Sequence, residues 1–535
     1  MGEPAARADA DPDRRRFHAP GHDHLRRDRH APRRHRPLRP VGLRDPAHAR
    51  RASALRSVPG AGDPVRPRGC AQVPGVPAAR EPGRARADAR GRPVPARPCL
   101  GTARGRACAG RARRRRKESV SPAPSRGRRL SALVVNYNTG RYAKACVESL
   151  QCEWRASGRA DADLEIVVVD NASPQDQSAA LAEIEALGAR VIRHPENAGY
   201  ATGMNLAFAQ TSGGPRDMVA ILNPDLHFLP GSIDALMDYL ETYAECGVID
   251  PRAWVDQART LMLPKNVLPT PIEQWRAVGA QLHPALCRAY SRRRLVTAIP
   301  WWVSDQPIES DMLSGCCLFL RREVVARMPH LMDPLYPLYF EDTDLFSTLR
   351  RLGYTVVHHC GAPVLHHWSR SAGVGGNYQG EPWRRFKIGE QRYYRKFHGA
   401  LGYALVRAAN WLAAKWPPAK SFRPMHPLVD LGEHADPIEI RLPRACEYLL
   451  EFSMTPTWLL AAGVPGHGER WQCPRETWEW YFQARYYVRA IEFDRRTQRP
   501  GALLGAWTFV KTTPGRDHPL EVNETRRSAT MEAAR

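Results

Sequence analysis

The chain has 535 residues and a formal net charge of +24, of which residues 1–130 contribute +23. The remaining residues are almost neutral, which argues against a basic nucleic-acid-binding domain in the folded part and leaves enough chain for a large catalytic domain and a smaller second one. This part contains no run of 18 apolar residues and no C-x-x-C pair. We therefore expect no transmembrane helix, no zinc site and a reduced, cytoplasmic location.

Residues 1–129 form a leader that is rich in Arg and Pro and contains no Ile, Asn, Tyr or Trp. With this composition the leader cannot bury enough apolar surface to offset the entropy lost on ordering, so we expect it to be disordered. One interpretation is an arm for nucleic acid or an anionic membrane, but the stacking aromatics of single-strand binders are missing. We favour a start assigned too far upstream, with translation beginning near Val120 and residues 1–119 not made.

Apolar runs alternate with helical patterns between residues 130 and 222. The runs predict buried strands at 130–135, 164–170, 190–193 and 218–222, and the segments between them predict helices from 141 onward, at 175–187 and at 206–210. This alternation predicts an α/β fold with a mostly parallel sheet and helices on both of its faces.

Polar side chains follow the strand ends, where open α/β sheets bind their ligands. Asn136 and Asn138 follow the first strand, and Asp170 ends the second, where a nucleotide ribose or base would lie. The alternative for Asp170 is a helix cap or a turn. The loop 195–205 opens a helix, so its backbone amides can approach phosphate.

Two acidic clusters occur about 115 residues apart, one after an apolar run and one after an aromatic run. Asp225, in Asn223-Pro-Asp225, can bind Mg²⁺ or Mn²⁺ together with substrate phosphates, although such a residue in isolation is more often part of a turn. Glu341, Asp342 and Asp344 follow an aromatic run and suit a general base, but they also suit the first turn of a helix. Together the clusters predict a metal-diphosphate site that faces a catalytic base.

Seven segments occur in the order seen in family 2 glycosyltransferases, which the chain resembles over about residues 130 to 400. They are Val134–Asn138, Val168–Asn171, Glu196–Gly199, Asn223–Asp225, Ser314–Gly315, Tyr339–Asp344 and His366–Ser371. The chain is similar to the rhamnosyltransferase-like and galactofuranosyltransferase-like branch. The resemblance implies a GT-A fold with a Rossmann-like sheet over 130–380, inverting transfer from a nucleotide-diphosphate sugar, and a divalent metal, Mg²⁺ or Mn²⁺.

The resemblance also implies roles for individual residues. Asp342 would be the base, with Glu341 or Asp344 positioning the acceptor. The nucleotide would contact Asn136, Asn138, Asp170, Asn197, Gly199, Asn205 and Asn223. Asp225 and His366 would hold the metal, with His367 the alternative to His366, while Ser314, Gly315 and Trp368 would lie on the acceptor side. Asn223 stands where the usual Asp-x-Asp motif has its first Asp, which leaves Asp225 as the stronger ligand.

The C-terminal third changes its pattern twice. Residues 381–430 predict a helical extension that either packs on the catalytic domain or lies at a bilayer interface through Trp411 and Trp416. Residues 431–515 alternate with period two, which predicts a small all-β, sandwich-like domain with strands at 438–442, 448–454, 478–488 and 507–511. We expect 516–535 to be a flexible tail.

These observations predict an inverting glycosyltransferase that moves a sugar from a nucleotide-diphosphate donor to a glycan or lipid-linked acceptor in cell-surface polysaccharide biosynthesis. It would act in the cytoplasm, with peripheral contact to the inner face of the plasma membrane as a further possibility. The alternatives are a carbohydrate-active hydrolase, a non-catalytic sugar-binding protein and, more distantly, a nucleic-acid-binding protein acting through the leader. A hydrolase would use two carboxylates but would not need Asp170, the glycine-bearing loop or Asp225. We expect no nucleic-acid partner.

Overall fold

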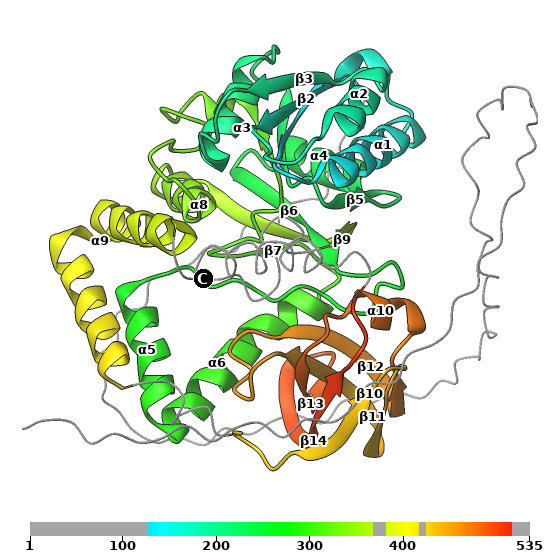
Figure 1. Cartoon of the computed structure of the whole chain (residues 1–535), viewed down its shortest axis with the longest axis vertical. Coiled ribbons are helices and arrows are strands. Elements are labelled where there is room, and N and C mark those ends of the chain that lie inside the picture. The colour runs from blue at the N-terminus through cyan, green and yellow to red at the C-terminus, as the bar shows by residue number, and fades with distance from the viewer. Residues whose placement is uncertain (1–126, 368–380, 417–423, 516–535) are drawn as a thin grey trace, which may run out of the picture. The chain divides into compact units, whose positions relative to one another are not determined.

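The computed structural model describes residues 127–367, 381–416 and 424–515, and Figure 1 shows how its helices and strands are arranged. The predictions for residues 1–126, for Trp368 and for the tail 516–535 lie outside the described residues. No helix within these three ranges has both the length and the apolar character needed to cross a membrane.

The first part of the described chain is built on a nine-stranded sheet of order β3-β2-β1-β4-β8-β6-β9-β5, with β7 paired to β9. Its strands are β1 (Leu130–Asn136), β2 (Leu164–Asn171), β3 (Arg190–His194), β4 (Met218–Leu222), β5 (Leu226–Phe228), β6 (Cys246–Trp254), β7 (Ile308–Glu309), β8 (Cys317–Arg321) and β9 (Thr355–His366). The four strands predicted between residues 130 and 222 are confirmed as β1 to β4, and the α/β fold class is confirmed with them.

The strand directions decide which loops meet. Strands β3, β2, β1 and β4 run parallel, whereas β8 is antiparallel to β4 and β5 is antiparallel to β9. Because Leu222 pairs with Cys317, the chain leaving β4 meets the chain entering β8. Because Leu226 pairs with His366, the end of β9 lies beside the chain that follows β4. Three segments distant in sequence therefore converge at the carboxyl end of β4.

Helices cover both faces of this sheet. The helices of this part are α1 (Gly140–Ala156), α2 (Ser178–Ala186), α3 (Tyr200–Ala209), α4 (Ser232–Thr242), α5 (Pro271–Leu282), α6 (Pro284–Val303), α7 (Arg322–Val325), α8 (Glu341–Arg351) and α9 (Glu381–Lys415), with a 3₁₀ turn η1 at Asp161–Asp163. Helices α5 and α9 pack on each other and on neighbouring helices. Along β1, Ala132 and Val134 join the core cluster that includes α1, α2 and α4, while Leu133 and Val135 join the cluster that includes α3, α6 and α8. Successive side chains of a strand point to opposite faces of the sheet, so a strand that is buried on both faces contributes to both cores.

A second sheet follows α9 and has five strands in the order β10-β14-β13-β11-β12. The strands are β10 (Val429–His434), β11 (Glu439–Ser453), β12 (Ala462–Gln472), β13 (Arg485–Asp494) and β14 (Arg499–Lys511). The all-β unit is confirmed, but its described strands form one sheet instead of a sandwich. Its Leu449 and Ile491 pack in the same cluster as Trp302 of α6, so a helix covers the face that a second sheet was expected to cover.

Three local predictions were wrong. Residues 478–488 were predicted to be one strand, but helix α10 (Arg475–Trp480) occupies the start of this run and β13 begins only at Arg485. Residues 438–442 and 448–454 were predicted to be separate strands, but both fall in the single strand β11, whose pairing with β12 is irregular between Arg441 and Cys446. Helix α3 begins at Tyr200 and not at Leu206, because Gly199 adopts φ 88° at the N-cap and the chain turns there. Helix α9 confirms the helical prediction for this region, and it bends at Gly399.

Candidate functional site

Side chains at the ends of β1 and β2 form one hydrogen-bonded network. Asn136 donates from Nδ2 to Asp170 Oδ1 at 2.7 Å, and the Ser173 hydroxyl donates to the same oxygen at 2.6 Å. Asn138 adopts φ 58°, and its backbone N–H donates to Ser173 at 2.9 Å. The sequence therefore predicted correctly that Asn136, Asn138 and Asp170 lie together, and their binding of a nucleotide stays a prediction.

The glycine-bearing loop before α3 joins this network from the side of β2. Asn171 donates to Asn197 Oδ1 at 3.0 Å, and Asn197 in turn accepts from the Gly199 N–H at 3.1 Å. A Cβ atom on Gly199 would lie 3.1 Å from the carbonyl oxygen of Pro337. Glycine thus permits both the left-handed turn and the close approach of the chain that leads to the acidic cluster.

Tyr200, the first residue of α3, links the two halves of the site, and the sequence analysis missed it. Its hydroxyl donates to Asn223 Oδ1 at 3.1 Å. Burial raises the pKa of Tyr200 well above its usual value, and the nearby carboxyls of Glu341, Asp342 and Asp225 raise it further. Tyr200 therefore stays a neutral hydroxyl between the two acidic clusters.

Asp225 and His366 come together where β5 pairs with β9. His366 Nε2 lies 3.2 Å from Asp225 Oδ1 and 3.4 Å from Asn223 Nδ2. Burial favours neutral forms of both groups, but their mutual attraction outweighs it. The attraction between Asp225 and His366 lowers the pKa of Asp225. The same attraction, together with Cys316, raises the pKa of His366. The other ring nitrogen of His366 is buried and has no hydrogen-bond partner within the described residues.

This pair offers a limited set of metal donors. No group of three or more His, Cys, Asp and Glu able to hold a metal occurs among the described residues. One carboxylate and one imidazole fit a divalent ion whose remaining ligands are oxygens of a bound diphosphate and water, which is how Mg²⁺ commonly binds in nucleotide sites. They do not fit an ion held by protein ligands alone.

Glu341 and Asp342 begin helix α8 after a strained turn. Tyr339 and Phe340 adopt φ values of 63° and 70°, which non-glycine residues reach only at a cost of about 1–3 kcal/mol each. Burial raises the pKa of both carboxyls, and the neighbouring Asp342 helps to raise that of Glu341 to about 8. Oε2 of Glu341 is buried and has no hydrogen-bond partner in the described structure. Such buried carboxyls destabilise the fold and are therefore candidates for function.

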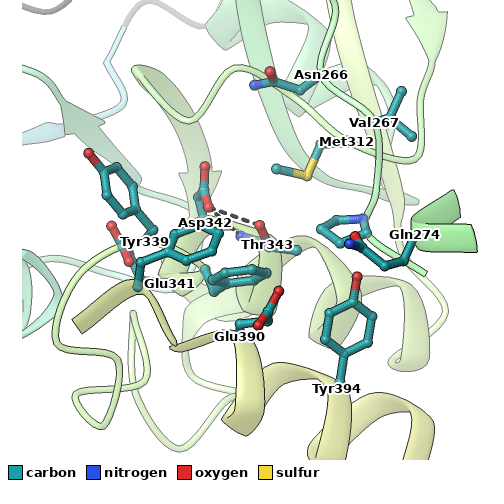
Figure 2. Close-up of a pocket in the computed structure, with 13 residues that line it drawn as sticks. Asn266, Val267, Gln274, Met312, Tyr339, Glu341, Asp342, Thr343, Glu390 and Tyr394 are labelled. Carbon is teal, nitrogen blue, oxygen red and sulfur yellow. Dashed lines mark hydrogen bonds between the residues drawn. The ribbon is translucent and has the colours of Figure 1, made fainter. Parts of the chain in front are cut away.

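Asp342 faces the loop that enters β8. It accepts from the Thr343 N–H at 2.6 Å and from the Thr343 hydroxyl at 3.1 Å, as Figure 2 shows. Gly315 lies so close that a Cβ atom there would come within 2.5 Å of Asp342 Oδ2. Gly315 therefore lies directly beside the Asp342 carboxylate, and the acceptor-side role of Ser314 and Gly315 stays a prediction.

A buried acid–histidine pair, also missed from the sequence, supports this loop. Asp250 accepts from the Ser314 N–H at 3.1 Å through one oxygen, and its other oxygen lies 2.7 Å from His358 Nδ1. The His358 ring stacks on Trp301 at 3.6 Å and 11°. Both members are almost fully buried, so they hold the backbone at Ser314, the residue next to Gly315.

Two predicted site residues make structural contacts elsewhere. Asp344 accepts from Tyr336 at 2.7 Å and pairs with Lys396 of α9 at 2.7 Å, so its carboxylate is engaged in joining helices. Asn205 hydrogen-bonds to the backbone of Met332 through both its amide atoms, at 2.7 and 3.2 Å. Neither lies in direct contact with the networks above, and their ligand-binding roles stay predictions.

Comparisons with known proteins show what this chain is similar to. Residues 131–294 match the family model described as glycosyl transferase family 2, and together with the relatives below this match supports a family 2 glycosyltransferase domain. Over 255 residues, the chain is 27% identical to the N-acetylglucosaminyl-diphospho-decaprenol L-rhamnosyltransferase of Mycobacterium tuberculosis, in two strains. The match covers 46% of this chain and 78% of the relative, so the domain is rhamnosyltransferase-like.

Solved structures give weaker likenesses. The mannosyltransferase PcManGT from Pyrobaculum calidifontis, in complex with GDP-Man and Mn²⁺, has a TM-score of 0.32 and 15% identity, covering 57% of this chain and 81% of that one. TarS residues 1–349 from S. aureus, in complex with UDP-GlcNAc, has a TM-score of 0.33 and 13% identity, covering 55% and 75%.

Proposed function

We propose that the protein transfers a sugar, with inversion, from a nucleotide-diphosphate donor to a hydroxyl of a glycan or lipid-linked acceptor in cell-wall polysaccharide synthesis. The observation that carries this proposal is that two acidic groups near Tyr200 have pKa values shifted in opposite directions. Asp225, beside His366, has a lowered pKa and suits a cation with phosphates, whereas Glu341 and Asp342 have raised pKa values and suit proton transfer.

The donor would lie along the strand ends. Its nucleoside would contact Asn136, Asn138 and Asp170, and its diphosphate would approach the start of α3, where free backbone N–H groups favour an anion. Asp225 and His366 would hold the divalent metal, which when bound offsets the negative charge that builds on the leaving diphosphate. Tyr200 keeps Asn223 oriented beside them through its hydroxyl.

The acceptor hydroxyl would be activated at Asp342. The carboxylate takes the proton while the hydroxyl oxygen forms a bond to the anomeric carbon of the donor. The bond between that carbon and the diphosphate oxygen breaks, and its electron pair leaves with the diphosphate. Attack from the side opposite the leaving group inverts the anomeric centre. The raised pKa of Asp342 brings it closer to the working pH and makes it a stronger base than an exposed carboxylate.

The relative in Mycobacterium tuberculosis supports rhamnose as the sugar and a polyprenyl-linked sugar as the acceptor. Helix α9 supports a membrane location for that acceptor. Leu401 and Trp411 of α9 are 75% and 63% exposed, and Trp416, directly after the helix, is 60% exposed. Arg407 and Lys415 of α9 are exposed as well. Apolar and aromatic residues mixed with basic ones suit the surface of an anionic membrane.

The test is release of nucleoside diphosphate by the full chain from a panel of nucleotide sugars, including a rhamnose donor, with Mn²⁺ or Mg²⁺. We expect release only when a lipid-linked sugar acceptor is present, and we expect the product to have the inverted anomeric configuration by NMR. Equal release without acceptor would indicate a hydrolase, and no release from any donor would refute the proposal.

A further inference from the structure

A cavity of about 440 Å³ lies beside Asp342, as Figure 2 shows. Its walls come from the loop 266–269, α5, Met312, the turn into α8, and α9. The lining residues are Asn266, Val267, Pro269, Gln274, Met312, Tyr339, Phe340, Glu341, Asp342, Thr343, Phe386, Glu390 and Tyr394. None of the residues predicted to bind the nucleotide or the metal is among them.

The charge of this cavity excludes one class of ligand. Its lining includes the carboxyls of Glu341, Asp342 and Glu390, and the thirteen lining residues include no Lys, Arg or His. Because the pKa of Glu341 is raised to about 8, the negative charge comes from Asp342 and from Glu390, whose partner Lys387 is not part of the lining. A phosphate or carboxylate entering the cavity meets no cation among the lining residues and is disfavoured beside these carboxylates. Carboxylates and amide groups instead accept hydrogen bonds from the hydroxyls of a neutral ligand.

The apolar part of the lining consists of the side-chain types expected in a sugar-binding site. Tyr339, Phe340, Phe386 and Tyr394 contribute aromatic rings, and Phe386 packs against Phe340 with ring centroids 5.3 Å apart. A pyranose presents flat patches of C–H groups on its faces and hydroxyls around its rim. Aromatic walls combined with a few polar groups suit such a ligand better than they suit a purely apolar one.

Two contacts hold α9 in place as a wall of the cavity. A Cβ atom on Gly389 would lie 3.0 Å from the carbonyl oxygen of Tyr339, so the backbone of α9 packs directly on the strained turn. The next residue, Glu390, is 9% exposed and accepts from Lys387 at 2.7 Å and from Asn410 at 3.4 Å. Asn410 also accepts from Gln274 of α5 at 2.7 Å. Glu390 is therefore held at a fixed position relative to Asp342.

We propose that this cavity binds an uncharged sugar residue of the acceptor, with Glu390 accepting hydrogen bonds from its hydroxyls and Phe386 packing on its face. This inference rests on the proposed function and adds the acceptor's chemical class to it. Any phosphate that links the sugar to a lipid lies outside the cavity, and Glu390 selects against sugars that carry a carboxylate.

The experiment compares two probes that differ in one group, p-nitrophenyl β-glucoside and p-nitrophenyl β-glucuronide. Saturation-transfer NMR with the full chain measures their binding independently of turnover. We expect at least about a five-fold stronger signal from the glucoside. Glu390→Gln and Phe386→Ala should each reduce the glucoside signal at least five-fold, whereas Glu183→Gln, which changes an exposed Lys-paired carboxylate on α2, should leave it at the wild-type level.

The shift in melting temperature caused by a nucleoside diphosphate with Mn²⁺ serves as the check on the donor side, and it should persist in both cavity variants. Equal binding of the two probes by the wild-type protein, absence of binding by both, or undiminished glucoside binding by both variants would overturn the inference. None of these results would affect the proposed function, because that proposal is tested by acceptor-dependent release of nucleoside diphosphate from the wild-type chain and not by binding of these probes.

Discussion

Gly315 and Asp342 are in contact across the site, with no space between them for a side chain. A Cβ atom on Gly315 would lie 2.5 Å from Oδ2 of Asp342 and 3.2 Å from its Cγ, and Gly315 itself adopts φ 72°. The antiparallel pairing of β8 with β4 brings the glycine there, and the pair formed by Asp250 and His358 supports the adjoining residue Ser314. The loop before β8 thus sets the position of the Asp342 carboxylate.

The first prediction follows from this contact. Gly315→Ala should displace the Asp342 carboxylate and lower the turnover number at least ~10-fold, because a small misplacement of a catalytic group is costly. The measurement is the steady-state rate of nucleoside diphosphate release at saturating donor and acceptor.

Gly353→Ala provides the matched control for backbone strain. Gly353 adopts φ 88°, but nothing lies within 4 Å of the position of its Cβ atom. Both variants should lose about 1–2 kcal/mol of stability from a left-handed alanine, whereas only Gly315→Ala should lose turnover. Equal turnover in the two variants would show that Gly315 is present for its backbone conformation alone.

The second prediction concerns stability as a function of pH. Burial and Asp342 raise the pKa of Glu341 to about 8 in the folded protein, from about 4.3 in an unfolded chain. The folded state therefore binds this proton more tightly, so the contribution of Glu341 to stability is complete below pH 4 and is lost as the pH rises through about 8. Glu341→Gln removes this loss and should raise the melting temperature at pH 8–9 by at least about 2 °C.

The pH profile separates this effect from simple changes in packing. At pH 4–5, where the native carboxyl is protonated, the melting temperatures of Glu341→Gln and the wild type should agree more closely than they do at pH 9. A difference in melting temperature that stays constant from pH 4 to pH 9 would contradict the raised pKa. The same variant is expected to lose activity, so the native residue would lower stability while serving function.

The sequence was sufficient to predict features that depend on local pattern. The buried runs that became β1 to β4 are continuous and apolar, and the polar residues at their ends lie at the predicted edge of the sheet. Asp225 and the acidic cluster from Glu341 to Asp344 therefore emerged as candidates from pattern, whereas the roles of His366 and Asp342 came from the resemblance to family 2 glycosyltransferases.

Features that depend on pairing between distant strands could not be predicted in the same way. The antiparallel direction of β8, which brings Gly315 to Asp342, has no signal in the five residues of that strand. Tyr200 was missed because an aromatic residue at a helix start is most often part of the core, and Glu390 was missed because it lies in an amphipathic helix among other charged residues. The aromatic run around Trp478 fits a strand by propensity, but its tertiary packing formed helix α10 there.

The third prediction tests the metal site. Mn²⁺ together with a nucleoside diphosphate should raise the melting temperature of the wild-type protein, because a ligand that binds only the native state stabilises it by mass action. Asp225→Ala should abolish the part of this shift that requires Mn²⁺ and should abolish transfer. Asp161→Ala, which removes an exposed carboxylate paired with Arg155, should behave as the wild type. Transfer that persists in Asp225→Ala, or that a chelator leaves unchanged, would rule out the metal.

The last prediction separates two acids that lie two positions apart on α8. Asp342 has a raised pKa and contacts Thr343 and Gly315, whereas Asp344 accepts from Tyr336 and pairs with Lys396. Asp342→Asn should retain binding of the donor nucleotide and its melting temperature while turnover falls at least ~10²-fold, the lower end for loss of a general base. Asp344→Asn should instead lower stability by about 1.5–3 kcal/mol, because it weakens hydrogen bonds to a buried charged group.

Turnover at 25 °C and thermal unfolding are both measured for each variant. Wild-type turnover in Asp342→Asn, together with loss of turnover at an unchanged melting temperature in Asp344→Asn, would assign the base to Asp344.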